Sequence, residues 1–144
     1  MAIAPGLALV LRTDGASRGN PGPAAAGVVI EDAAGQVLAR GRHYLGEMSN
    51  NQAEYRALIL GLKAVARYRP AAVTVKMDSE LVVNQMHGTY KVRDEGLRPL
   101  HEAARTLAQH LPGVRFVHVP RAQNRLADAL ANEALDAEAK HACS

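Results

Sequence analysis

The stretch Leu7-Ala8-Leu9-Val10-Leu11-Arg12-Thr13-Asp14-Gly15 has the apolar run and the length of a β-strand, and an Asp-Gly turn signal ends it. A second stretch of the same construction, Val73–Met77 followed by Asp78, lies between two helical segments. Strands separated by a helix run parallel, and the functional side chains of such sheets gather beyond the carboxyl ends of the strands. The sequence therefore predicts an α/β sheet with Asp14 and Asp78 at one edge.

The segments around these two strands complete a βββαβααβα order. Further strands are expected at 26–30, 37–44 and 114–119, with a loop at 17–23 and a turn at 32–35. Helices are expected from the Ser49-Asn50-Asn51 cap to about residue 68, and at about 80–87, 96–110 and 124–140. The first three strands form an antiparallel meander. We therefore expect a mixed five-stranded sheet with helices on both faces.

Length and composition fit one globular domain spanning residues 1–144, with a core at about 7–138. A hydrophobic fraction of 48% beside 22% charged residues excludes a disordered chain. The N-terminal residues resemble neither a signal peptide nor a membrane span, so we expect no membrane partner. The single cysteine, Cys143, cannot form an internal disulfide, which favours a reducing, cytoplasmic location. We expect the chain to act as a monomer.

The charge balance permits nucleic-acid binding without requiring it. Lys and Arg number 17 against 14 Asp and Glu, a net charge of +3, and this mild excess alone selects no partner. The absence of Trp and the single Phe argue against base stacking as the main source of binding.

Four acidic residues occupy ends of the expected elements: Asp14, Glu54, Asp78 and Asp128. Each has an ordinary explanation as a turn residue, a capping-box acid (Ser49 with Gln52, or Asn51 with Glu54), a helix cap or a solvated helix face. These explanations do not account for the fact that all four acids lie at ends of strands or helices that the predicted topology can bring to one place. Like charges at close range need a proton or a cation, and Mg²⁺ suits a site lined by oxygen. Two such ions roughly 4 Å apart can activate water and stabilise the leaving oxygen of a phosphodiester.

Longer motifs in the sequence resemble those of the type 1 ribonuclease H family. In order along the chain they are Thr13–Pro23 (TDGASRGNPGP), Asn50–Leu58 (NNQAEYRAL), Asp78–Val83 (DSELVV) and His118–Asn132 (HVPRAQNRLADALAN). The resemblance extends from about residue 9 to residue 135. It implies the ribonuclease H-like fold and an enzyme that hydrolyses the RNA strand of RNA–DNA hybrids, leaving 5′-phosphate and 3′-hydroxyl ends.

The resemblance also implies roles for individual residues. Asp14, Glu54, Asp78 and Asp128 match the carboxylates that hold two Mg²⁺ or Mn²⁺ ions. Asn20, Asn50 and Asn51 match residues that read the RNA 2′-hydroxyl in the minor groove, while helix capping and an Asn-Pro turn are their structural alternatives. Ser17 and Ser49 are weaker candidates for contacts with the substrate backbone.

Two features depart from many family members. The loop before Asp128 is the short His118-Val119-Pro120-Arg121 form, so we interpret His118 as a structural histidine of the strand. Arg121 is the better catalytic candidate, as a cation that holds a phosphate, although an ordinary surface arginine is equally compatible with its position. Between Asp78 and Leu100 there is no Lys- and Trp-rich protrusion, and we expect no hybrid-binding module before Asp14, so we expect weak, salt-dependent binding. Short-loop relatives also accept double-stranded RNA, which leaves that substrate open.

Two other classes compete with this interpretation. A catalytically silent nucleic-acid-binding domain on the same fold would be expected to lack at least one of the four acids, and all four are present. A phosphatase or nucleotide-binding protein is disfavoured because Gly19–Pro23 is neither a P-loop nor a dinucleotide fingerprint, and its prolines lack N–H donors.

Overall fold

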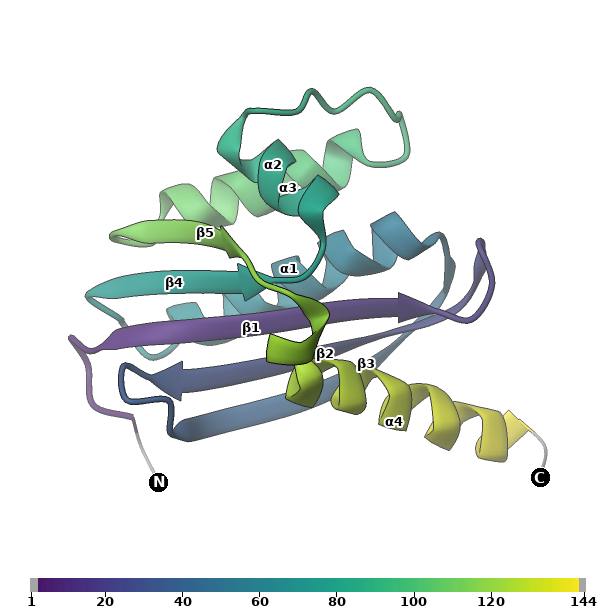
Figure 1. Cartoon of the computed structure of the whole chain (residues 1–144), viewed down its shortest axis with the longest axis horizontal. Helices are drawn as coiled ribbons and strands as arrows, with labels where there is room; N and C mark the ends of the chain where they lie inside the picture. Colours follow the sequence, from purple (N-terminus) through teal and green to yellow (C-terminus); the bar gives the residue numbers. More distant parts are fainter. Residues whose placement is uncertain (1–2, 143–144) are drawn as a thin grey trace.

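Residues 3–142 are described by the computed structural model, and Cys143 lies outside them. The strands are β1 (Ala8–Ser17), β2 (Gly22–Asp32), β3 (Val37–Met48), β4 (Ala72–Met77) and β5 (Val114–His118). The helices are α1 (Asn50–Ala66), α2 (Glu80–His87), α3 (Arg98–Gln109) and α4 (Arg125–Ala142), with a 3₁₀ turn, η1 (Arg121–Gln123), before α4. The expected βββαβααβα order is confirmed (Figure 1).

The five strands form one mixed sheet in the order β3-β2-β1-β4-β5. β1 pairs antiparallel with β2, and β2 with β3, while β4 is parallel to both β1 and β5. α4 covers one face of the sheet, and α1, α2 and α3 lie on the other side (Figure 1). Helices on both faces are thus confirmed.

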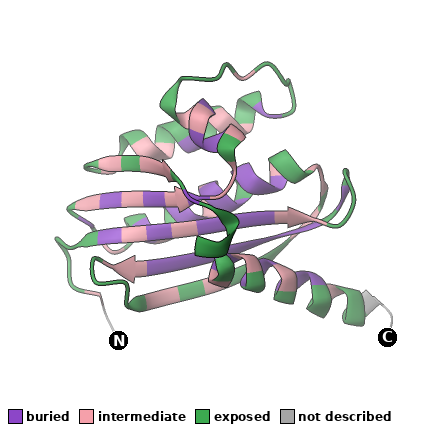
Figure 2. Ribbon diagram, viewed as in Figure 1, coloured by how far each residue is buried: buried purple, intermediate pink, exposed green. Residues whose placement is uncertain are grey.

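The two faces differ in how they are packed. On the α1 side, large apolar residues of β1 and β4 such as Leu11 and Val75 join Tyr55 and Leu58 of α1 in the main core. On the α4 side, the buried residues are mostly small, with Ala127, Ala131 and Ala134 against the alanine-rich β2. Burial is therefore concentrated in the central strands β1, β2 and β4 and on the inner faces of the helices, while β3 and β5 at the two edges have no buried residue (Figure 2). Because small residues let backbones approach closely, α4 packs tightly against the sheet.

β1 is longer than expected, and this changes the setting of Asp14. Parallel pairing with β4 ends at Arg12, whereas antiparallel pairing with β2 continues to the pair Ser17↔Ala24. Asp14 therefore lies inside β1 rather than in a turn, yet still beyond the last residue paired with β4. The expected 17–23 loop is reduced to residues 18–21, because Ser17 belongs to β1 and Gly22 begins β2.

Other boundaries also move. β2 and β3 extend beyond 26–30 and 37–44 because the two strands pair along almost their whole length. α3 begins at Arg98 rather than at residue 96, with Pro99 in its first turn, where the missing N–H is tolerated. α4 begins at Arg125, and the η1 turn before it was not expected. Among the described residues, no helix is both long and apolar enough to span a membrane.

Candidate metal centre and active site

Three of the four candidate carboxylates meet in one place. Side-chain oxygens of Asp14 on β1, Glu54 on α1 and Asp78 after β4 all lie within 4.8 Å of one another. Asp14 and Glu54 are only 5% and 7% exposed, and Asp78 is half-buried. These residues line a cleft of about 400 Å³. The structure thus brings together acids that are 24 and 40 residues from one another in the chain.

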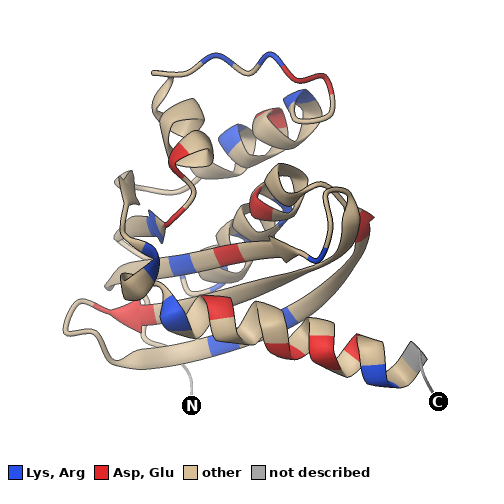
Figure 3. Ribbon diagram, turned by 45° about the vertical axis from the view of Figure 1, so that its right-hand side comes forward, with Lys and Arg blue, Asp and Glu red and all other residues tan. Residues whose placement is uncertain are grey.

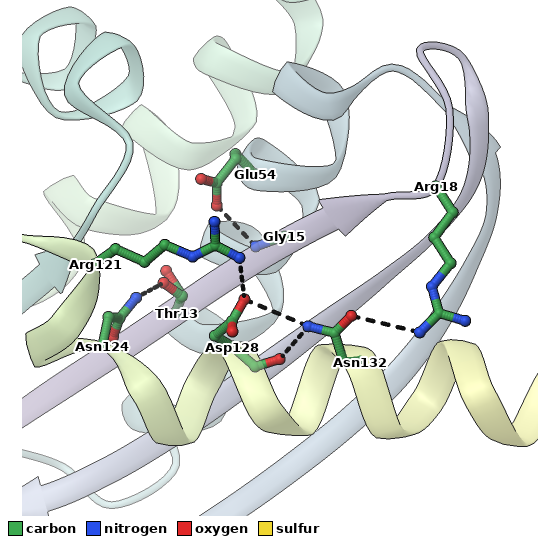
Figure 4. Close-up of polar contacts among 8 residues, drawn as sticks. All are labelled: Thr13, Gly15, Arg18, Glu54, Arg121, Asn124, Asp128 and Asn132. Carbon is green, nitrogen blue, oxygen red and sulfur yellow. Dashed lines mark hydrogen bonds and ion pairs between the residues drawn. The ribbon is translucent and has the colours of Figure 1, made fainter.

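Asp128 lies in the same cleft but outside this group of three. Its side chain comes from the first turn of α4 and lies near that of Asp14, whose pKa it helps to raise. Its Oδ1 also lies 3.4 Å from Asn132 Nδ2, which donates to it, and 3.5 Å from Arg121 Nη2 (Figure 4). Asp14 is therefore the member of the group of three whose pKa Asp128 raises both by its charge and as a side-chain neighbour.

The position of Glu54 depends on a glycine of the neighbouring strand. The backbone N–H of Gly15 donates to Glu54 Oε1 at 2.7 Å (Figure 4). A Cβ at residue 15 would overlap the carbonyl group of Ala53 and the amide nitrogen of Glu54. The absence of a side chain at Gly15 therefore lets the first turn of α1 rest directly on β1.

The N-cap of α1 involves other residues than Glu54. Ser49 and Gln52 form a reciprocal capping box, with hydrogen bonds of 3.2 and 2.9 Å. Of the two capping patterns compatible with the sequence, the one that pairs Asn51 with Glu54 is therefore wrong. Glu54 is left to hydrogen-bond β1 and to face the cleft.

A second glycine, which sequence reasoning missed, brings α4 to the site. Gly27 of β2 pairs with Asp14 across the sheet, and a Cβ at residue 27 would overlap the carbonyl oxygen of Ala127. The neighbour of that carbonyl in the chain is Asp128. A glycine inside an otherwise apolar strand signals such a close backbone approach, and this signal was available in the sequence.

Two further residues, also missed, hold the segment before α4 against β1. Asn124 is buried, and its Nδ2 donates to the carbonyl oxygen of Thr13 at 2.9 Å (Figure 4). Arg12 Nη1 donates to the carbonyl oxygen of Gln123 at 2.6 Å, and its Nε lies 3.0 Å from Glu31 Oε1. Arg12 shares a face of β1 with Asp14 because side chains alternate along a strand. These contacts place η1, with Arg121, beside the cleft.

Asp78 follows β4 as expected, but it is not the cap of the next helix. Ser79 is the N-cap of α2, and its hydroxyl accepts a hydrogen bond from the N–H of Val82 at 3.3 Å. The capping explanation for Asp78 is therefore wrong.

The electrostatics of the cluster favour a bound cation. Burial is the largest cause that raises the pKa of Asp14 above its ordinary value, followed by the charges of Glu54 and Asp78. Burial likewise raises the pKa of Glu54, although the hydrogen bond from Gly15 works in the opposite direction. Acids that resist ionisation near one another accept a proton or a divalent cation. All the donors are carboxylate oxygens, which fits the preference of Mg²⁺.

The candidate substrate residues lie around the rim of this cleft. Ser17, Asn50 and Asn51 line it, together with Arg121, whose side chain is 78% exposed. Asn20 and Ser49 support the rim: Asn20 Oδ1 accepts from the N–H of Asn50 at 3.0 Å, and Ser49 caps α1. Ser17 Oγ donates to the carbonyl oxygen of Met48 at 3.0 Å. His118 ends β5 with an exposed side chain and is not among the residues that line the cleft.

Comparison with known proteins agrees with this fold and site. The family described as reverse transcriptase-like matches residues 12–134. Ribonuclease HI of Halobacterium salinarum is 47% identical over 123 residues, which are 85% of this chain and 62% of that protein. A bifunctional protein of Mycobacterium tuberculosis is 44% identical over 137 residues, 94% of this chain and 38% of that protein. The chain therefore spans less than two thirds of the length of these relatives.

Solved structures give the same result. The N-terminal RNase H domain of the M. tuberculosis protein superposes with a TM-score of 0.90 at 44% identity, covering 94% of this chain and 99% of that one. LC11-RNase H1, solved in complex with an RNA/DNA hybrid, superposes with a TM-score of 0.87 at 42% identity, covering 90% and 98%. A sheet of this topology with an acidic cluster at its edge defines the class of ribonuclease H-like proteins. The chain belongs to the reverse transcriptase-like family and, within it, to type 1 ribonuclease H.

Proposed function

We propose that this chain is an endoribonuclease that hydrolyses the RNA strand of RNA–DNA hybrids, leaving 5′-phosphate and 3′-hydroxyl ends. The observation that carries the proposal is the convergence of carboxylates from β1, α1, β4 and α4 on one cleft, beside asparagines that can contact a nucleic acid. A relative of the same fold, 42% identical, was solved with such a hybrid.

In this proposal Asp14, Glu54, Asp78 and Asp128 hold two divalent cations, Mg²⁺ or Mn²⁺. Asp14 would be the central ligand of this set, because it belongs to the group of three and also lies near Asp128, which helps to raise its pKa. When bound, the cations supply the Lewis acidity that activates water and stabilises the departing oxygen. The sheet and the two helices hold the acids in place before substrate arrives, so little reorganisation is required at the moment of reaction.

The remaining rim residues select and orient the substrate. Asn50 and Asn51 present amides that both donate and accept, which suits a 2′-hydroxyl that DNA lacks. Ser17, Asn20 and Ser49 keep that rim in place through their contacts with Met48, Asn50 and Gln52. Arg121 offers a permanent positive charge to the scissile or departing phosphate.

The expected partner is the hybrid duplex, with double-stranded RNA as a second substrate to test. We expect weak binding, because the connector between α2 and α3 contains only two basic residues, Lys91 and Arg93, both exposed. We further propose that the whole chain 1–144 acts as one domain and as a monomer in the cytoplasm. The single cysteine of the sequence is compatible with that reducing location.

The test is a gel assay with end-labelled RNA–DNA, RNA–RNA and DNA–DNA duplexes, each incubated with Mg²⁺, with Mn²⁺ and with a chelator. We expect metal-dependent cleavage of the RNA strand in the hybrid and no cleavage of DNA–DNA. Retained cleavage in a purified Asp14→Asn variant would reject the assignment of the site. Binding of the hybrid without cleavage under every metal condition would instead support a silent nucleic-acid-binding domain.

A further inference from the structure

A line of polar contacts runs along the rim of the cleft on the α4 side. Asn132 Nδ2 donates to Asp128, and Asn132 Oδ1 lies 3.4 Å from Nη2 of Arg18, which donates to it (Figure 4). The same nitrogen of Arg18 lies 2.6 Å from Asp136 Oδ1. Arg18 is thus linked to the proposed metal centre through Asn132, while its main partner, Asp136, lies one turn beyond that asparagine on α4.

The backbone at Arg18 is well fixed, whereas its guanidinium is not enclosed. Arg18 opens the short connector 18–21, where its N–H donates to the carbonyl oxygen of Pro23 at 2.8 Å. Just before this connector, the hydroxyl of Ser17 donates to Met48 at the end of β3, and within it Oδ1 of Asn20 accepts from the N–H of Asn50 at the start of α1. The side chain of Arg18 is 44% exposed and lines the same cleft as the carboxylates and Asn50.

The contact with Asp136 can be exchanged at little cost. The Asp136 side chain is 63% exposed, and ion pairs between exposed side chains contribute little to stability. Figure 3 marks several acidic residues along the ribbon of α4, of which Asp136 is the one that pairs with Arg18. A backbone phosphodiester also carries a negative charge and has two non-bridging oxygens, which a guanidinium can bind with two parallel hydrogen bonds, whereas Arg18 reaches Asp136 through a single nitrogen.

We propose that Arg18 binds a backbone phosphate of the hybrid, and that Asp136 competes for its guanidinium in the free protein. This inference rests on the proposed function, because it takes the hybrid as the ligand. Arg18 lines the cleft from its α4 side, and Asn50 and Asn51 line it from α1, so a duplex seated over the carboxylates would meet both. Asp136 then lowers the affinity for nucleic acid although it contacts no substrate.

Substitutions of Arg18 and of Asp136 are expected to change hybrid binding in opposite directions. If the ion pair only stabilised the fold, the two substitutions would not have opposite effects. The readout is the dissociation constant of a fluorescein-labelled RNA–DNA hybrid, measured by anisotropy with a chelator present. Arg18→Ala is expected to raise it on the order of fivefold and to reduce the dependence of binding on salt by about one counterion. Arg18→Lys, which keeps the charge but loses the planar fork, should fall between wild type and Arg18→Ala. Asp136→Ala is expected to lower the constant by about twofold to threefold.

A matched control accounts for net charge. Glu133→Ala removes another exposed acid of α4, which is 3.6 Å from Arg42 and does not line the cleft, so its effect should be smaller than that of Asp136→Ala. In the Arg18→Ala background the gain from Asp136→Ala should vanish, since the two residues act on one interaction. Weaker binding in Asp136→Ala, or equal gains from the Glu133 and Asp136 variants, would overturn the proposal.

Failure of the proposed function is distinguishable from failure of this inference. If the wild type cleaves no hybrid while the opposite shifts in binding are seen, the nuclease proposal fails and the role of Arg18 stands. If the wild type cleaves the hybrid and Arg18→Ala binds it as tightly as wild type, the role of Arg18 fails and the nuclease proposal stands. Thermal unfolding of each variant checks that the exposed substitutions leave the fold unchanged.

Discussion

The carboxylate of Glu54 and the backbone N–H of Gly15 are joined by a buried hydrogen bond of 2.7 Å, one residue beyond Asp14. The bond connects α1 to β1 at the point where two acids repel each other. It stabilises the ionised form of Glu54, while burial and the other acids disfavour that form. The geometry of the cluster therefore depends on how closely the helix approaches the strand.

The substitution Gly15→Ala should disrupt this approach. Its Cβ would overlap backbone atoms of Ala53 and Glu54, which cannot move away as a flexible side chain could. We expect a loss of about 3 kcal/mol in the free energy of unfolding, at the upper end of overpacking effects, together with loss of hybrid cleavage. Urea denaturation and the gel assay measure the two effects. The control is Gly41→Ala in β3, where the nearest atom to a new Cβ is His43 Nε2 at 3.4 Å and the effect should be small.

The substitution Asp14→Asn should abolish cleavage and make the metal-free protein more stable. The pKa of Asp14 is raised in the folded protein, so its contribution to stability is present below the unfolded value of 3.8 and is lost as the pH rises through the folded value. An asparagine at residue 14 carries no charge at any of these pH values, so the variant does not lose this stability as the pH rises. We expect a gain of about 1 to 3 kcal/mol at neutral or higher pH, shrinking toward pH 4.

Denaturation of wild type and Asp14→Asn in a chelator, across pH 4 to about 9, checks this sign. A variant that is less stable than wild type at every pH would show that Asp14 is held by favourable contacts rather than by repulsion. Cleavage by the variant would separately remove Asp14 from the catalytic site.

Divalent metal should stabilise the wild-type protein and depend on Asp78. A ligand that binds only the folded state raises stability by about 2.7 kcal/mol at one hundred times its dissociation constant. We expect Mg²⁺ to raise the melting temperature of wild type and to have little effect on Asp78→Asn, which lacks one carboxylate of the group of three. Glu133→Gln is the control, because Glu133 is an exposed acid on α4 that pairs with Arg42. Equal responses of both variants would indicate diffuse charge screening instead of a site.

Much of this arrangement can be predicted from local patterns, and some of it cannot. A strand or a helix can be recognised from a pattern of residues that are neighbours in the chain, such as the apolar run before Asp78 or the helical spacing after Asn51. The order of the elements could therefore be predicted from the sequence. The approach of α4 to Asp14 depends on Gly27 of β2 meeting Ala127, 100 residues away. The glycine indicates that some backbone approaches β2 closely, but no local pattern identifies Ala127 as the partner. The same holds for Arg12 and Gln123, whose pairing holds the unexpected η1 turn.

Arg12 allows stability and positioning to be separated. Its guanidinium, mostly buried, pairs with Glu31 and also donates to the carbonyl oxygen of Gln123, next to the turn that carries Arg121. Arg12→Met keeps the apolar stem but leaves Glu31 unpaired, which should cost about 1 to 3 kcal/mol. Adding Glu31→Gln removes the unpaired charge and should restore much of that loss. The hydrogen bond to Gln123 stays absent, so we expect the cleavage rate of the double variant to remain several-fold below wild type. Urea denaturation and single-turnover cleavage measure the two quantities, and recovery of both together would mean that Arg12 supports the fold without positioning the turn.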